Sequence, residues 1–170
     1  MQYSKRVLQI FQNPVNYGKI KNPDGIGKAG NIVCGDVMAI YIKVKKDKKN
    51  QDIISDIKFE TFGCVAAIAT SSIMTSLAKG KTLQSALKIG KQNIVKNLNG
   101  LPPTKVHCSL LSTDALFEAI FDYYSRHDQD KITKDMIKRH TDIEKDQAEI
   151  KKRYKNWVDN EEKKLNKHSK

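Results

Sequence analysis

The sequence predicts an α+β fold in which a β-hairpin is followed by a series of helices and a charged helical extension. Apolar residues alternate along 37–44 and 53–62, and from residue 65 onward they recur at helical spacing. From about residue 133 the chain becomes strongly charged. A chain of 170 residues is long enough for one compact domain with its own core plus an extension.

The first elements are a short helix, a loop and the hairpin. Residues 4–12 begin with Ser4, a preferred helix cap, and end before Asn13-Pro14, which stops a helix. Asn, Gly and Pro accumulate over 13–31, so we expect that segment to be loop. Each strand is expected to bury one face, formed by Met38, Ile40, Ile42 and Val44 in the first strand and by Ile53, Ile57 and Phe59 in the second.

Helices are expected over 65–79, 82–87 and 93–98, the first of them ending before Gly80. The segment 100–105 contains two prolines, which favour an extended path, so it is expected not to be helical. A further helix should run from about residue 109 or 112 to 125.

A polar stretch at 127–134 predicts a boundary between a domain over residues 1–126 and a charged amphipathic helical extension over 127–170. The extension carries one apolar stripe, formed by Ile143, Ile150, Tyr154 and Trp157. We favour packing of this stripe against the domain over its use as a docking surface for a partner helix.

Composition excludes several classes of function. The formal net charge is +12, but the lysines are scattered and accompany no recognisable nucleic-acid motif, so nucleic acid is not an expected partner. No apolar run is long enough to span a membrane, and nothing at the start resembles a secretion signal. Three cysteines, an odd number, argue against a disulfide framework and for a reducing compartment, the cytoplasm.

The three cysteines are Cys34, Cys64 and Cys108, and each lies where two expected elements meet. With Asp36 and His107 they make five candidate ligands, and three thiolates plus one oxygen or nitrogen ligand suit zinc or an iron–sulfur cluster. Cys64 and Cys108 stand near helix N-termini, where the helix dipole stabilises a thiolate. Any one of the cysteines, taken alone, could equally be a small buried hydrophobic residue.

Other chemistry is less well supported. The sequence has no Cys-x-x-Cys pair, which argues against a zinc finger. A hydrolase using His107 and Cys108 is disfavoured, because adjacent residues seldom face each other as base and nucleophile.

Several blocks occur in an order that resembles a known family. They include Cys34-Gly-Asp-Val-Met38, Phe59-x-Thr-Phe-Gly-Cys64 and Leu101-Pro-Pro-Thr-Lys-Val-His-Cys-Ser109. Over roughly residues 3–126 the chain resembles the IscU-type iron–sulfur cluster assembly scaffolds, which are also found as the N-terminal domain of NifU proteins. The resemblance implies a small antiparallel sheet with helices on one side.

The resemblance also implies roles for the candidate ligands. Cys34, Cys64 and Cys108 would hold the nascent cluster, which is 2Fe–2S or, after further assembly, 4Fe–4S. Asp36 would be a ligand to the iron or help to release the product, and His107 would be an alternative ligand. Cys108 would be the principal acceptor of persulfide sulfur from a cysteine desulfurase, and the finished cluster would pass to apo-proteins.

The chain departs from the family pattern at two places that bear on function. Val65-Ala66 follow Cys64 where the family usually has Gly-Ser, which should stiffen and dry that turn. Thr104 replaces a valine in the segment that normally docks an Hsp70-type chaperone, and this counts against such a partner. That segment consists of Leu101, Pro102, Pro103, Thr104 and Lys105.

The expected function is therefore assembly of an iron–sulfur cluster on a scaffold that is not a turnover enzyme, acting as a monomer or a homodimer. The alternative is a zinc-bound persulfide acceptor for a cysteine desulfurase. In that alternative, and in the cluster-free scaffold, zinc would occupy the same thiolates.

Overall fold

A three-stranded antiparallel sheet with helices packed on one face forms the body of the protein, which confirms the expected α+β fold with a small antiparallel sheet. The computed structural model describes residues 2–31 and 35–168, and the side chains of these except Tyr154 and residues 156–168. The strands are β1 (Gly25–Gly30), β2 (Val37–Lys46) and β3 (Asp52–Phe62), and β2 lies in the middle. The α-helices are α1 (Lys5–Gln12), α2 (Val65–Ala78), α3 (Leu83–Ala86), α4 (Lys91–Asn97), α5 (His107–His127) and α6 (Lys134–His168).

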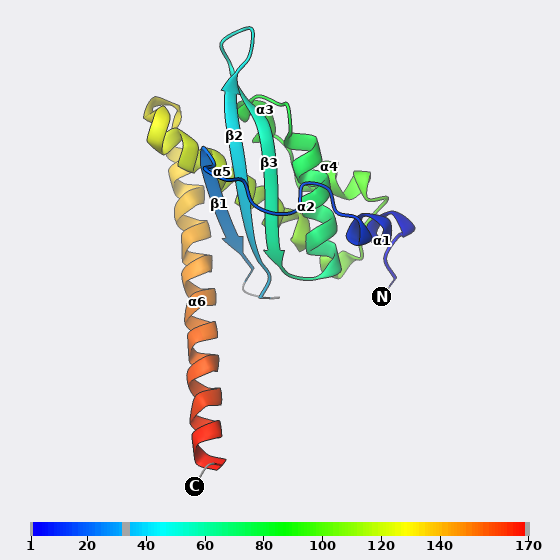
Figure 1. The fold of residues 1–170 in the computed structure, drawn as a ribbon, viewed down its shortest axis with the longest axis vertical. Coiled ribbons are helices and arrows are strands. Elements are labelled where there is room, and N and C mark those ends of the chain that lie inside the picture. Colours follow the sequence, from blue (N-terminus) through cyan, green and yellow to red (C-terminus); the bar gives the residue numbers. More distant parts are fainter. Residues whose placement is uncertain (1, 32–34, 169–170) are drawn as a thin grey trace.

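The core lies between the sheet and two of these helices (Figure 1). Helix α5 packs against β1 and β2, while α2 packs against β3, α1 and α5. Met38, Ile40 and Ile42 of β2 point into this layer and are buried, which confirms the expected face of the first strand apart from Val44, which is only partly buried. Burial of each such side chain contributes roughly 1.5–3 kcal/mol.

Strand β1 corrects the expectation that residues 13–31 are all loop. Its sequence, Gly-Ile-Gly-Lys-Ala-Gly, has little strand propensity, because glycine lacks a side chain to pack. The glycines are needed here because α5 lies directly on the strand. A Cβ atom at Gly25 would lie 2.2 Å from the carbonyl oxygen of Ala119, and one at Gly27 would lie 1.9 Å from that of Ala115.

A one-residue bulge in β3 corrects the expected buried face of the second strand. Lys43 pairs with Asp56 but Val44 pairs with Ile54, which leaves Ser55 as an extra residue in β3. The Ser55 hydroxyl donates a hydrogen bond of 3.1 Å to the Lys43 carbonyl. Because the bulge shifts the alternation by one residue, Ile54 rather than Ile53 joins Ile57 and Phe59 in the core.

The expected helix starts are confirmed in two places. The Ser4 hydroxyl accepts a hydrogen bond of 3.2 Å from the Val7 N–H, and Thr82 caps α3 in the same way through the Ser85 N–H. Two expectations were wrong. Pro103–Lys105 forms one turn of 3₁₀ helix, with proline at its start where no N–H is needed, and α5 begins at His107, earlier than expected.

Helix α6 lies beside β1 and continues past the ends of the strands (Figure 1). Ile143 and Ile150 are buried, which confirms that this part of the apolar stripe packs against the domain, while the side chains of Tyr154 and Trp157 lie outside the described part. The His140 ring stacks on Phe121 of α5 with ring centres 4.2 Å apart. The division of the chain near residue 127 stays a prediction. Among the described residues, no helix is long and apolar enough to cross a membrane.

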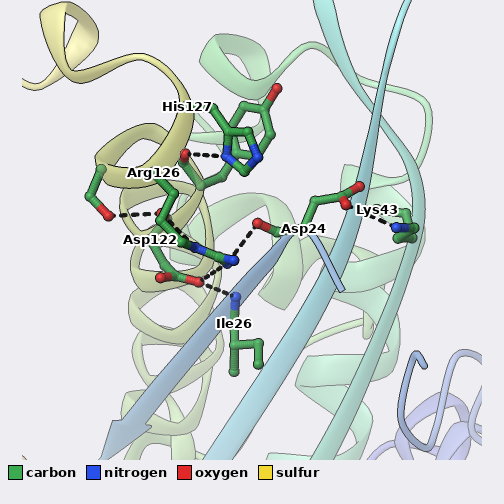
Figure 2. Close-up of polar contacts among 8 residues, drawn as sticks. Asp24, Ile26, Lys43, Asp122, Arg126 and His127 are labelled. Carbon is green, nitrogen blue, oxygen red and sulfur yellow. Dashed lines mark hydrogen bonds and ion pairs between the residues drawn. The ribbon is translucent and has the colours of Figure 1, made fainter. Parts of the chain in front are cut away.

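A polar latch joins the start of β1 to the end of α5 (Figure 2). Asp122 accepts a hydrogen bond of 2.8 Å from the Ile26 N–H and pairs with Arg126, whose guanidinium donates to the Asp24 carbonyl. The Asp24 carboxylate in turn pairs with Lys43 at 2.8 Å and accepts from the Val44 N–H. The latch therefore fixes the end of the sheet farthest from Asp36 and Cys64.

Asp52, at the same end, should make the protein sensitive to acid. Its carboxylate is 6% exposed and pairs with Lys46 at 2.8 Å and Lys131 at 3.3 Å. Burial acts to raise the pKa of Asp52, but hydrogen bonds from the two lysines outweigh it and hold this pKa below its ordinary 3.8. A pKa that is lower in the folded state gives stabilisation that is present above the unfolded-state pKa and is lost as pH falls through the folded-state pKa.

We therefore expect the free energy of unfolding to decrease below about pH 4. Asp52→Asn should lower the free energy of unfolding by roughly 2 kcal/mol at neutral pH, and its stability should then depend less on pH in the acid range. Urea denaturation across this pH range measures both effects. A variant whose acid sensitivity equals that of the unmodified protein would contradict the assignment, and Asp47→Asn, in the exposed turn between β2 and β3, is the matched control.

Candidate metal centre

Three potential metal ligands meet at one end of the sheet. One ligand atom from each of Asp36, Cys64 and Cys108 lies within 4.8 Å of those of the other two. Asp36 directly precedes β2, Cys64 follows β3 as the N-cap of α2, and Cys108 is in the first turn of α5. The expected positions at element ends are therefore confirmed for Cys64 and Cys108.

The two cysteines are in direct contact, and neither forms a disulfide. Their Sγ atoms are 3.6 Å apart, and the Sγ of Cys108 is 4.0 Å from Oδ2 of Asp36. The Asp36 and Cys108 side chains are buried, whereas Cys64 is partly exposed. Two sulfur atoms and one carboxylate oxygen at these distances form a donor set that suits Zn²⁺ or iron.

Cys34 lies outside the described residues, so the structure does not place it. Its neighbour Gly35 has a positive φ of 71°, a conformation that glycine adopts without strain. The Gly35 N–H donates a hydrogen bond of 2.8 Å to the Asn31 carbonyl, and the Asn31 N–H donates to the Asp36 carbonyl. These bonds join the end of β1 to the start of β2 on either side of residues 32–34.

His107 is the first residue of α5 and is not a member of the group formed by Asp36, Cys64 and Cys108. Its side chain is partly buried, and its Nε2 atom is buried with no hydrogen-bond partner among the described residues. A buried ring nitrogen without a partner is costly, and a metal ion is one group that could satisfy it.

The surroundings of Cys64 favour the ionised form of its thiol. The hydrogen bond with Cys108 has the largest effect, and together with the Ala67 N–H and the positive charge of Lys105 it lowers the pKa of Cys64 from 9.0 to about 6. Burial and the negative charge of Asp36 act in the opposite direction. Cys64 is therefore largely a thiolate at neutral pH, as its place at a helix N-terminus predicts.

The burial of Cys108 differs from what a sulfur acceptor requires. An acceptor thiolate has to be exposed, yet the Cys108 residue is 0% exposed because it lies in the first turn of α5, against α2. The Thr70 hydroxyl of α2 donates to the Cys108 carbonyl at 3.2 Å and holds that turn in place. Of the two cysteines that the structure describes, Cys64 is the one that a reagent in solution reaches first in this conformation.

Alkylation of the metal-free protein by iodoacetamide should show this difference. We expect the rate at Cys64, followed by peptide mass spectrometry, to rise with pH about a midpoint near 6. In Cys108→Ala the midpoint should move up, because the hydrogen bond with the largest effect is lost. An unchanged midpoint in that variant would show that Cys108 does not stabilise the thiolate, and Thr113→Ala in the same helix serves as the control.

Tyr3 and Lys105 are near this site, and residue-by-residue reasoning did not assign them to it. Burial mainly raises the pKa of Tyr3, and the negative charges of Cys64, Cys108 and Asp36 raise it further. The negative charge of Cys64 is the main cause that raises the pKa of Lys105. Tyr3 opens the block Tyr3-Ser-Lys-Arg-Val and Lys105 lies in the block Leu101–Ser109. Both blocks resemble the scaffold family, and this resemblance was the signal that could have found the two residues. The Leu101–Lys105 segment is partly to fully exposed before α5.

The turn after Cys64 agrees with the expectation that Val65-Ala66 makes it drier. Ala66 is 0% exposed, and Val65 packs partly against the core. The Gly63 backbone approaches Asp36 so closely that a Cβ atom there would lie 3.0 Å from Cγ of Asp36.

Known proteins resemble this chain over the same region. The chain is 55% identical over 131 residues to iron–sulfur cluster assembly scaffold protein IscU 1 of Archaeoglobus fulgidus, a match that covers 76% of this chain and 82% of that protein. It is 45% identical over 134 residues to the IscU scaffold protein of Rickettsia prowazekii, covering 77% of this chain and 98% of that one.

A crystal structure of a SufU-type assembly scaffold from Fervidobacterium islandicum has the same fold. The TM-score is 0.57 and the identity 24%, with 69% of this chain and 96% of that chain covered. The family model described as "NifU-like N terminal domain" matches residues 2–130. From its sequence and its fold, the chain belongs to the NifU-like N-terminal domain family.

Proposed function

We propose that this protein is a scaffold on which an iron–sulfur cluster is assembled and from which it is transferred to other proteins. The observation that carries the proposal is the convergence of Asp36, Cys64 and Cys108 within 4.8 Å, although they come from distant parts of the chain. Relatives at 45–55% identity are named as iron–sulfur cluster assembly scaffolds, which supports it. The cluster is the cargo of such a protein, so the role is that of a scaffold and not of a turnover enzyme.

In this proposal Cys34, Cys64 and Cys108 bind the iron of a 2Fe–2S cluster, which a later step can convert to 4Fe–4S. Asp36, or His107 through its buried Nε2, completes the coordination. An oxygen or nitrogen ligand binds iron less tightly than a fourth thiolate, so the cluster stays removable. Zinc would occupy the same ligands in the cluster-free protein.

Sulfur arrives as the persulfide of a cysteine desulfurase, and Cys108 is the proposed acceptor. The Cys108 thiolate attacks the outer sulfur of the donor persulfide, a new S–S bond forms, and the donor cysteine leaves as a thiolate. An external reductant must then supply two electrons per sulfur atom to make sulfide. Because Cys108 is buried, the first turn of α5 has to open before the donor can reach it.

The partners that follow from this function are a cysteine desulfurase and apo iron–sulfur proteins. The exposure of Pro103 and Thr104 leaves the Leu101–Lys105 segment accessible to a partner such as an Hsp70-type chaperone, although Thr104 counts against it. A protein that acts through three reduced cysteines suits the cytoplasm, where thiols are kept reduced. It would act as a monomer or a homodimer.

Anaerobic reconstitution tests the function. The protein is incubated with ferrous iron, cysteine, a reductant and a cysteine desulfurase, and visible absorption is recorded before an apo-ferredoxin is added. We expect the absorption of a 2Fe–2S cluster, followed by its transfer to the ferredoxin. A protein that stays colourless and retains zinc would overturn the proposal in favour of a zinc-bound sulfur acceptor.

Asp36→Ala should make the assembled cluster longer-lived. Removing the exchangeable carboxylate leaves the thiolates and His107, so we expect transfer to apo-ferredoxin to slow by about tenfold. The rate of transfer, followed by circular dichroism, measures this. Faster loss of the cluster than in the unmodified protein would contradict a labilising role, and Asp56→Ala, distant on β3, is the control.

A further inference from the structure

A groove of about 420 Å³ lies on the face of the sheet that is turned away from α2 and α5. Strand register places Gly30, Val37 and Phe62 side by side across the three strands, and alternation directs Val37 away from the core residue Met38. Tyr17 borders the groove on one side and α6 on the other. The volume falls within the roughly 300–1,000 Å³ of typical ligand pockets.

The groove is apolar and accessible. Phe62 is 76% exposed, Tyr17 51% and Val37 37%, although all three are large hydrophobic side chains. Single exposed apolar residues are common, but a contiguous set around one hollow marks an interaction surface. Aromatic side chains in such a place are also typical of residues that dominate binding energy.

Helix α6 supplies one wall and is fixed in place there. Ile150 is 5% exposed, and its Cδ1 lies 2.4 Å from the position that a Cβ atom at Gly30 would take, so this side chain packs directly on the strand at that glycine. The Gln147 side chain donates a hydrogen bond to the Lys28 carbonyl of β1. The family match ends at residue 130, so the groove depends on a helix outside the region shared with the family.

The charges around the groove select the kind of partner. Lys28 and Lys151 line the groove and are exposed. The acidic residue Glu60 also lines it, but its Oε2 lies 3.5 Å from Nζ of Lys19 and accepts a hydrogen bond from the Tyr41 hydroxyl. The rim is therefore basic. A second copy of this chain, with a net charge of +12, would be repelled, and nucleic acid would not fill apolar walls.

We propose that this groove binds an acidic segment of a partner protein. An aromatic or leucine side chain of the segment lies between Phe62, Val37 and Ile150, and its carboxylates lie against Lys28 and Lys151. Val37 follows Asp36 in the chain, and only Gly63 separates Phe62 from Cys64, so a partner bound here stands next to the metal centre. The binding itself does not depend on the cluster.

The test uses the full metal-free chain and a fluorescein-labelled peptide with a central Leu-Phe pair flanked by runs of glutamate. Fluorescence anisotropy is measured at low and high salt against two control peptides, one with lysine flanks and one with Ala-Ala at its centre. We expect saturable binding of the acidic Leu-Phe peptide only, weakened by salt. Equal binding of the Ala-Ala peptide would overturn the proposal, because it would show charge attraction alone.

Variants locate the binding. The double variant Lys28→Glu with Lys151→Glu should bind the acidic Leu-Phe peptide with a dissociation constant about tenfold higher or more. The separate variant Phe62→Ser should have an effect of the same size. All three positions are exposed, so the fold should persist, which circular dichroism checks. Lys48→Glu, in the turn at the other end of the sheet, is the matched control and should bind normally. No binding by the unmodified protein, or equal loss in Lys48→Glu, would overturn the proposal, as would light scattering that shows the groove joining two copies of the chain.

Discussion

Replacing Cys108 by serine is expected to abolish persulfide capture from a cysteine desulfurase. Serine has nearly the same shape, so the buried first turn of α5 should keep its hydrogen bond from Thr70. The hydroxyl cannot form a persulfide or a stable bond to iron, and it also weakens the hydrogen bond that holds the Cys64 thiolate. We therefore expect loss of the captured sulfur and of cluster assembly by about a hundredfold or more.

Radiolabelled cysteine or persulfide-specific mass spectrometry measures the captured sulfur, and Cys64→Ser is the comparison. If Cys108 is the acceptor, Cys64→Ser should capture sulfur but build no stable cluster. Undiminished capture in Cys108→Ser would transfer the acceptor role to Cys34 or Cys64. Because Cys64 is the more exposed of these two thiols and its pKa is lowered to about 6, the two variants together decide how a buried acceptor is reached.

Replacing Gly27 by valine should prevent stable folding. Any Cβ atom at this position would lie 1.9 Å from the Ala115 carbonyl oxygen and 2.2 Å from the Ala119 nitrogen, both of them backbone atoms of α5. Because backbone cannot move aside cheaply, α5 would have to separate from β1. The expected loss in the free energy of unfolding is about 4 kcal/mol or more, which is a large part of the total for a domain of this size.

Urea denaturation followed by circular dichroism measures this loss, and Gly90→Ala is the control. At Gly90 the nearest atom to a new Cβ is 3.7 Å away and φ is −99°, so the cost there should be at most about 1 kcal/mol. A Gly27→Val protein with nearly unchanged stability would contradict the close contact between α5 and β1.

Local sequence signals predicted the elements that depend on local chemistry. Ser4 and Thr82 were found because a cap acts within its own turn, and β2 because its alternation is regular. Strand β1 was missed, since the glycines that lower its propensity are required by α5, almost a hundred residues away in sequence. The bulge at Ser55 was missed for a related reason: one extra residue reverses the buried face without changing the composition.

The site was predicted as a set of residues but not as a geometry. Thiolate chemistry and position at element ends selected Cys64 and Cys108, and Asp36 was selected because it lies two residues from Cys34. The structure brings these three of the five candidate ligands together. Which thiol is buried depends on how α5 packs against α2, and this tertiary contact leaves no pattern in the sequence around Cys108.

Other parts of the chain form hydrogen bonds with backbone groups at the outer edges of β1 and β3, and this affects how readily the protein aggregates at high concentration. Along β1, the Asp122 carboxylate accepts a hydrogen bond from the Ile26 N–H, and the Gln147 side chain of α6 donates one to the Lys28 carbonyl. Along β3, the Phe59 N–H donates to the Asn16 carbonyl and the Ile54 N–H to that of Lys81. Unpaired strand edges are where sheets of neighbouring molecules join into aggregates. Such growth would first have to displace α6 or the segment around Asn16, so we expect α6 also to hinder this aggregation.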